Sequence, residues 1–339
     1  MITRTARPAI GVAMVIASGA LFAVNGTVSK LVLQAGLTAH QLTALRAAGA
    51  AAALFALSLA LRPGRRRLAL TRRELPLLLA YGLTGFFAVP MLYFLAISRL
   101  PVGIALLFEY TAPLLVALWA RFGQRQRVRG RLWAGLALCL AGLACVAEVW
   151  GDTRLNGVGV LAGSAAAVLL AAYYVLGARG VRERDTLSLT TWAFAVAAVA
   201  GLATRAVTAG TAGWAPLAGS TKGVPVALLC AYVVLLGSVA PYLLVAGALR
   251  HLPATSVGII GMVEPVLAAM VAWLTLGGSE ALNTAQLGGG ALVLLGVALA
   301  ETARISAPAE QPPPPPPDAI LPTPTALDDR RGPVGSGPH

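Results

Sequence analysis

Charged residues are scarce in this sequence. They make up 12% of its 339 residues, whereas hydrophobic residues make up 58% and the mean hydropathy is +0.78. A soluble globular domain carries about 25% charged residues, so this chain lacks the charge that would cover a soluble surface. Apolar runs long enough to cross a bilayer, about 20 residues each, occupy most of its length. The scarcity of charge therefore predicts an all-α integral membrane protein.

Cysteine is also rare, and the motifs of common enzymes are missing. Cys139, Cys145 and Cys230 all fall inside apolar runs, with no CxxC pair and no neighbouring histidine. This pattern speaks against zinc and redox sites. No HExxH, GxSxG or GxxxxGK[ST] sequence occurs, and no pair of aspartates lies at membrane depth. We therefore expect no cofactor, no metal and no enzymatic activity.

Positive charge is present in excess, with a formal net charge of +13. The arginines form short clusters between apolar runs, as the positive-inside rule produces on cytoplasmic loops, which argues against nucleic-acid binding. With a cytoplasmic N-terminus, 20 of the 26 Lys and Arg residues fall in cytoplasmic segments and 4 in outer loops, so both termini are predicted to be cytoplasmic. The preponderance of arginine over lysine indicates a GC-rich bacterial genome. We expect a multi-pass protein of the bacterial cytoplasmic membrane.

Apolar runs bounded by Arg, Pro and Gly predict ten transmembrane helices. Unbroken helices are expected, because backbone polar groups in hydrocarbon must be satisfied within the segment. The ten ranges are 10–33, 39–61, 75–97, 101–122, 132–149, 157–178, 187–207, 224–249, 253–276 and 284–302. Residues 306–339, with the proline run 312–317, are predicted to form a disordered cytoplasmic tail.

An internal repeat divides the helices into two groups. A shift of 152 residues superimposes the third and fourth predicted helices on the eighth and ninth. The matched pairs are Gly85 and Gly237, Ala96 and Ala248, Leu100 and Leu252, Pro101 and Pro253, and Pro113 and Pro265. Each repeat, 10–149 and 157–303, holds five helices, an odd number, so the second must cross the membrane in the opposite sense. Inverted repeats are typical of secondary transporters, which bind substrate at the repeat interface.

The residues also resemble a known family over roughly 10–303. The chain is similar to the ten-helix EamA-type permeases of the drug/metabolite transporter superfamily. The resemblance rests on Arg46, the Pro113 and Pro265 pair, and Gly278–Glu280 after the ninth helix. The segment 103–113 and the Glu264-Pro265 pair are similar to the amino-acid exporter branch, of the threonine/homoserine type. The resemblance implies efflux or exchange of amino acids, metabolites or amphiphilic drugs.

Four ionisable residues fall inside the predicted helices: Lys30, Arg46, Glu109 and Glu264. Such groups are costly in a bilayer, by about 2.5–3.5 kcal/mol on insertion scales, and commonly mark function. At about 1.5 Å per residue, Glu109 and Arg46 lie roughly 10–12 Å below the outer helix ends, and Glu264 roughly 16 Å above an inner end. The similar depths predict an ion pair between Arg46 and Glu109, with Lys30 nearer the outer surface.

Two prolines and four polar residues complete the candidate site. Pro113 and Pro265 remove backbone donors close to the two glutamates, so both helices should kink there and line a cavity. Asn25, Tyr93, Tyr110 and Tyr242 could present hydrogen-bonding groups to a polar solute. Helix packing is the alternative role for each of these residues.

These features predict a secondary transporter that exports small metabolites, such as amino acids or amphiphilic compounds, by alternating access at the repeat interface. Glu109 or Glu264 would take up a proton or hold a substrate ammonium group. The partners are then a small-molecule substrate and the lipid bilayer; proton coupling stays open, as does the choice between monomer and homodimer. The alternatives are a receptor or scaffold acting through the Pro-rich tail, and a membrane-embedded enzyme.

Overall fold

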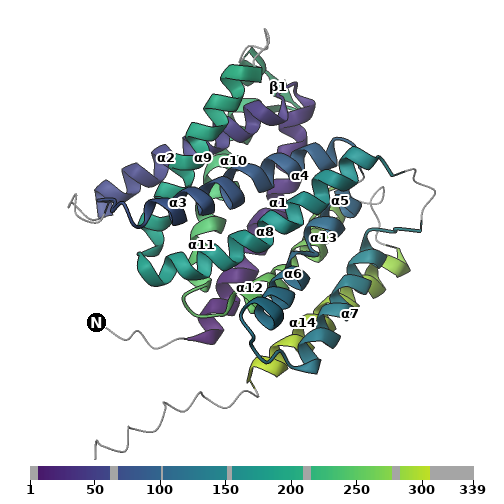
Figure 1. Ribbon diagram of the computed structural model, residues 1–339. Helices are drawn as coiled ribbons and strands as arrows, with labels where there is room; N and C mark the ends of the chain where they lie inside the picture. Colours follow the sequence, from purple (N-terminus) through teal and green to yellow (C-terminus); the bar gives the residue numbers. More distant parts are fainter. Residues whose placement is uncertain are drawn as a thin grey trace, which may run out of the picture. The chain divides into compact units, whose positions relative to one another are not determined.

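The computed structural model describes residues 7–61, 68–100, 102–150, 155–208, 215–276 and 283–305, which are helical almost throughout (Figure 1). The predicted tail 306–339, Pro101 and Gly278–Glu280 lie outside the described residues. The helical segments of the first repeat are α1 (Pro8–Gln34), α2 (Ala39–Leu61), α3 (Leu75–Tyr81), η2 (Gly82–Ala88), α4 (Val89–Ile97), α5 (Val102–Glu109), α6 (Ala112–Leu118), η3 (Trp119–Gly123) and α7 (Gly130–Val146).

The second repeat adds a short hairpin to the same series of helices. Its segments are α8 (Gly157–Glu183), α9 (Thr186–Thr208), η4 (Ala215–Ala218), β1 (Ser220–Thr221), β2 (Val224–Pro225), α10 (Val226–Val234), η5 (Leu235–Val239), α11 (Ala240–Ala248), α12 (Ala254–Gly261), α13 (Glu264–Leu276) and α14 (Thr284–Ile305). The strands pair antiparallel. Lys222 and Gly223 between them have positive φ angles of 48° and 79°, as in two-residue hairpin turns. The helix expected from residue 224 therefore begins after the hairpin.

Among the described residues, eight helical spans are long and apolar enough to cross a membrane. Two shorter apolar helices, Gly130–Val146 and Ala254–Ala268, accompany them. Each predicted apolar run coincides with one helix or with consecutive helical segments. Long apolar runs bounded by Arg, Pro and Gly thus located the helices, because a bilayer requires about 20 mostly apolar residues for each span.

The expectation of unbroken helices is wrong at several places. The chain leaves helical geometry at residues 110–111, just before Pro113, and at 262–263, just before Pro265. The segments η2, η3 and η5 are π-helical, and η2 and η5 each end two residues before a proline, Pro90 and Pro241. Because proline has no N–H, the preceding turn cannot keep regular α-helical hydrogen bonds.

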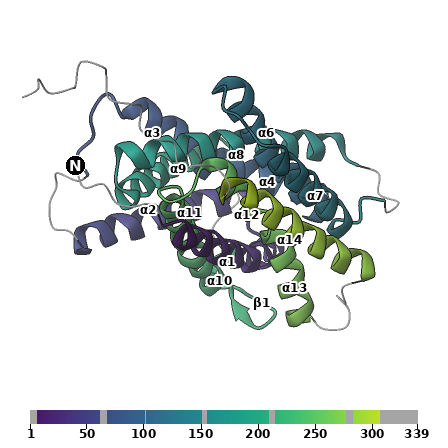
Figure 2. The ribbon, with the colours of Figure 1, turned by 90° about the horizontal axis from the view of Figure 1, so that it is seen from below.

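Helices α7 and α14 pack side by side through small residues (Figures 1 and 2). Each contributes two glycines seven residues apart: Gly135 faces Gly296, and Gly142 faces Gly289. An added Cβ on Gly135 or Gly142 would lie 2.5 Å from the carbonyl oxygen of its partner glycine. This pairing makes the two helices antiparallel, although they hold the same place in their repeats.

Other contacts follow the same internal symmetry. Gly11, near the start of α1, lies against Leu252, and Gly159, near the start of α8, lies against Leu100. Leu100 and Leu252 are related by the 152-residue shift. Helix α1 packs against α10–α13 of the second repeat, and α8 packs against α3–α6 of the first. Two helix groups result, α1 with α10–α13 and α8 with α3–α6, and each mixes both repeats.

One face of the helices carries an ion pair between the repeats. Arg184, after α8, contacts Glu74, before α3, at 2.8 Å, and donates a second hydrogen bond to the carbonyl oxygen of Ala69 at 2.6 Å. Desolvation raises the pKa of Glu74, but hydrogen bonds from Thr71 and the charge of Arg184 outweigh it, so the pKa lies below its usual value. The α2–α3 and α8–α9 connections therefore share a face.

Candidate functional site

A cavity of about 450 Å³ lies between the two helix groups. This volume is within the range of about 300–1,000 Å³ that small-molecule sites occupy. One wall comes from α1, α11 and α13, and the other from α4, α5 and α8. Each wall contains helices of both repeats, so residues of both repeats line the cavity and neither wall belongs to one repeat alone.

The cavity brings together the side chains singled out from the sequence. Those lining it are Asn25, Lys30, Arg46, Tyr93, Glu109, Tyr110, Tyr242 and Glu264, with Pro265 beside them. Pro113 packs instead against Gly258 of α12. Positions along the predicted helices placed these residues at membrane depth, but only the fold shows that they line the same cavity.

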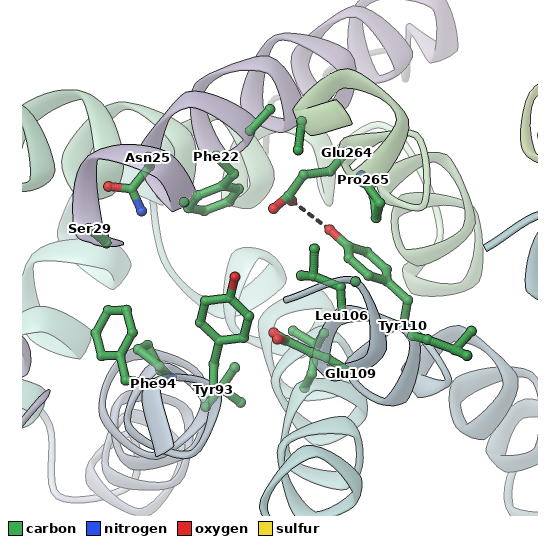
Figure 3. Close-up of a pocket in the computed structure, with 18 of the residues that line it drawn as sticks. Phe22, Asn25, Ser29, Tyr93, Phe94, Leu106, Glu109, Tyr110, Glu264 and Pro265 are labelled. Carbon is green, nitrogen blue, oxygen red and sulfur yellow. Dashed lines mark hydrogen bonds between the residues drawn. The ribbon is translucent and has the colours of Figure 1, made fainter. Parts of the chain in front are cut away.

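The two glutamates lie where the helices are interrupted (Figure 3). Glu109 is the last residue of α5, and Glu264 is the first residue of α13. Tyr110, in the break after α5, donates its hydroxyl hydrogen to Glu264 Oε2 at 2.6 Å. The carboxylate of Glu109 points into the cavity near Tyr93. Among the described ion pairs, neither carboxylate has a Lys or Arg nitrogen within 4.0 Å.

The predicted ion pair between Arg46 and Glu109 is wrong. Arg46 is 3% exposed; its Nη2 donates to the carbonyl oxygen of Phe86 at 2.7 Å, and its Nη1 donates to Ser238 Oγ at 3.4 Å. Pro90 cannot donate an N–H to Phe86 four residues earlier, so this carbonyl is available to the guanidinium. The Arg46 Cζ also lies 5.4 Å from the ring centroid of Tyr242, within cation–π range.

Unpaired polar atoms gather at the other end of the cavity, on α1 and α2. Within the described residues, the buried side-chain atoms without a hydrogen-bond partner are Asn25 Oδ1, Ser29 Oγ, Arg46 Nε and Tyr81 Oη. The first three belong to residues that line the cavity. The amide of Asn25 packs against Gly237, next to the Ser238 that Arg46 contacts. Buried polar groups normally have partners, so this end is equipped to receive a polar ligand.

An aromatic cluster closes the cavity toward the face of the Arg184–Glu74 pair. Its members are Tyr81, Phe86, Tyr173, Phe194 and Tyr242, with neighbouring ring centroids 4.5–6.0 Å apart. All five are buried. The cavity extends the other way, along residues 22–30 of α1 and 89–94 of α4. Sequence reasoning found only Tyr242 of this cluster, although aromatic residues far from helix ends could have signalled it, because interfacial belts do not explain them.

The described residues contain no group of three or more His, Cys, Asp or Glu side chains that could hold a metal ion. The described side chains that line the cavity offer carboxylates, hydroxyl groups, an amide group and positive charges.

Comparison with known proteins gives two kinds of match. The model of the EamA-like transporter family matches residues 9–147 and again 157–302. The chain is 33% identical over 217 residues to the threonine/homoserine exporter RhtA of Salmonella typhimurium (strain LT2), covering 64% of this chain and 68% of that protein. Its Escherichia coli (strain K12) counterpart is 32% identical over 227 residues, 67% and 70% of the two chains.

More distant matches agree in fold. An uncharacterized transporter of Synechocystis, sll1319, is 27% identical over 230 residues, 66% of each chain. A crystal structure with 21% sequence identity aligns over 89% of this chain and all of its own, with a TM-score of 0.72. At that identity the match establishes a shared fold alone.

Proposed function

Because the chain belongs to the EamA-like transporter family, we propose that it is a secondary transporter that exports small metabolites such as amino acids or amphiphilic compounds. The observation that carries the proposal is the cavity with Glu109 and Glu264 on opposite walls. Ionisable side chains inside membrane-spanning segments are costly and mark substrate or ion pathways. No enzymatic activity is proposed.

The proposed topology has ten transmembrane helices in two inverted repeats, 10–149 and 157–303. Eight long apolar spans and two shorter apolar helices support the count, and the antiparallel α7 and α14 support the inversion. Both termini face the cytoplasm of a bacterial cell, since arginines concentrate in the connections at the Arg184 face. The Pro-rich segment 306–339 is then a cytoplasmic tail.

The interleaved helix groups support alternating access as the mechanism. The group of α1 and α10–α13 rocks against the group of α8 and α3–α6, so that the cavity faces each side in turn. Glu109, whose carboxylate points into the cavity, takes up a proton or a substrate ammonium group. Glu264 is held in place by Tyr110. The two RhtA relatives are threonine/homoserine exporters, which supports amino acids as substrates.

The test is transport by the purified full chain in proteoliposomes. We expect uptake or exchange of labelled threonine that responds to a pH gradient, and its loss in Glu109→Gln, which keeps the size but removes the charge. Glu183→Gln is the matched control, because Glu183 pairs with Arg179 outside the cavity. Wild-type protein that is folded yet moves neither amino acids nor cationic dyes would overturn the proposal, and full activity of Glu109→Gln would remove that residue from it.

A further inference from the structure

The cavity has two chemically opposite ends. We propose that it binds its substrate as a zwitterion, with the ammonium group between Glu109 and Glu264 and the carboxylate group at Asn25, Ser29 and Lys30. This inference rests on the proposed transport function and narrows its substrate class to free α-amino acids.

The acidic end is built to receive a cation. Two carboxylates, one from each wall, line it without a Lys or Arg partner within 4.0 Å among the described ion pairs. Tyr110 uses its one hydroxyl hydrogen on Glu264 and fixes that carboxylate. Two carboxylates in a low-dielectric space need hydrogen-bond donors and a neutralising charge. An ammonium group supplies both, because it has three donors and a positive charge. The rings of Tyr93 and Tyr110 stand beside this end, and aromatic faces also attract cations.

The opposite end is built to receive an acceptor. Asn25 and Ser29 are four residues apart and so share one face of α1, and Lys30 follows them. Ser29 is 1% exposed, and its hydroxyl group has no partner. Lys30 is an exposed ammonium group at the cavity wall. A carboxylate accepts only, so it can pair with the Ser29 hydroxyl group and the Lys30 charge together. From Asn25 it can accept only the amide N–H, because Asn25 Oδ1 is itself an acceptor and lies against Gly237.

The two ends face one another across the cavity. Figure 3 shows Asn25 and Ser29 on one side of the close-up and Glu109, Tyr110 and Glu264 on the other. Phe22 and Tyr93 lie between them. Arg46 adds positive charge beside the Asn25 end, because it contacts Ser238 and Asn25 packs against Gly237. The cavity is therefore negative at the glutamates and positive near Lys30 and Arg46. An amino acid that lies along it places its ammonium group at the negative end and its carboxylate at the positive end.

A substrate with only a cationic group fits this arrangement less well. It would satisfy the glutamates but leave Ser29 unpaired, and Lys30 would repel it. A purely anionic substrate could pair with Ser29 and Lys30, but the carboxylates of Glu109 and Glu264 would repel it. Binding sites discriminate strongly against analogues that leave buried polar groups unpaired.

The experiment measures competition against labelled L-threonine transport by the full chain in proteoliposomes. The competitors are L-threoninol, which lacks the carboxylate, N-acetyl-L-threonine, which lacks the ammonium group, and tetraphenylphosphonium. For wild-type protein we expect each to compete at least tenfold more weakly than unlabelled threonine.

Variants then assign the two ends separately. In Lys30→Gln and Ser29→Ala, the preference for threonine over L-threoninol should fall at least threefold, while the preference over N-acetyl-L-threonine stays. Glu264→Gln should show the converse. Lys222→Gln is the matched control, because Lys222 is the other lysine of the chain and lies in the β1–β2 hairpin turn.

The outcomes separate this inference from the proposed function. If L-threoninol or tetraphenylphosphonium competes as well as threonine, or is carried when threonine is not, the zwitterion site is overturned while transport stands. If Lys30→Gln, Ser29→Ala and Glu264→Gln all leave both preferences unchanged, the assignment of the ends is overturned. If folded wild-type protein carries no solute, both proposals fail.

Discussion

Arg46 is the residue for which sequence reasoning and structure differ most. Depth along the helices favoured Glu109 as its partner, because opposite charges in a membrane are expected to pair. The guanidinium instead binds the backbone of η2 and Ser238 of η5, and lies over Tyr242. A planar group with five donors can make these contacts at once. Depth estimates cannot reveal this, because they ignore which backbone carbonyls prolines expose.

Replacing Arg46 by lysine should therefore be damaging despite the conserved charge. A single ammonium group cannot bind both Phe86 and Ser238 and stack on an aromatic ring. We expect Arg46→Lys to lower unfolding stability by about 1–3 kcal/mol and to reduce transport at least tenfold. Thermal unfolding in detergent and transport in proteoliposomes measure the two effects, with the exposed Arg131→Lys as the control. Unchanged stability and transport would contradict the role given to these contacts.

At the scale of the elements, the sequence predicted the helices well and their interruptions partly. Long apolar runs ending in Arg or Pro located the segments, and Pro113 and Pro265 marked two of the irregular places. The π-helical segments were missed, since a proline such as Pro90 signals a lost hydrogen bond but not how the preceding turn adapts. The contact between α7 and α14 was also missed, because glycines in an apolar run do not indicate which helix packs against them.

The α7–α14 interface gives a sharp test at this scale. A Cβ on Gly289 would lie 2.6 Å from the carbonyl oxygen of Gly142 and 2.7 Å from Cys145 Cβ, whereas one on the adjacent Gly288 would meet nothing within 4 Å. Gly289→Ala should lower unfolding stability by about 1–3 kcal/mol through overpacking. Gly288→Ala should leave it unchanged or slightly raised, because alanine favours helix. Equal melting temperatures in detergent for the two variants would refute the close approach.

For the whole molecule, the family assignment made from the sequence is confirmed: the EamA-like transporter family model matches the chain twice. The repeat was visible because the prolines and Gly85 recur at one shift. The sequence did not show that each helix group contains helices of both repeats. A shift along the sequence identifies which segments are alike, but it does not identify which segments are in contact. The roles of Glu109, Glu264, Lys30 and the other cavity residues stay predictions.

Repeat symmetry predicts a contact that forms in the opposite state. Near the Arg184 face, a Cβ on Gly177 would lie 2.8 Å from Leu249 Cδ1. The 152-residue shift relates Leu249 to Ile97. Helices α1 and α8 are offset by 148 residues, as the equivalent contacts of Gly11 and Gly159 show (159 − 11 = 148), so the counterpart of Gly177 is Ser29. If the helix groups rock, Ser29 and Ile97 should approach when Gly177 and Leu249 separate.

Disulfide trapping tests this contact in a chain freed of its three native cysteines. During turnover, Ser29→Cys combined with Ile97→Cys should form a disulfide that stops transport, and reduction should restore it. Each single variant is a control for labelling alone. A double variant that transports normally and never cross-links would rule out the exchange of contacts between the repeats.

The likeness of the two repeats extends to the backbone and not to the charges. The position matching Glu109 is Gly261, and the one matching Glu264 is Ala112. A transporter whose two repeats were identical would populate both orientations equally. The charged side chains differ between the repeats. If the helix groups rock as proposed, the two orientations of the empty protein therefore differ in energy and in population, while the gradients of the solutes set the direction of net transport.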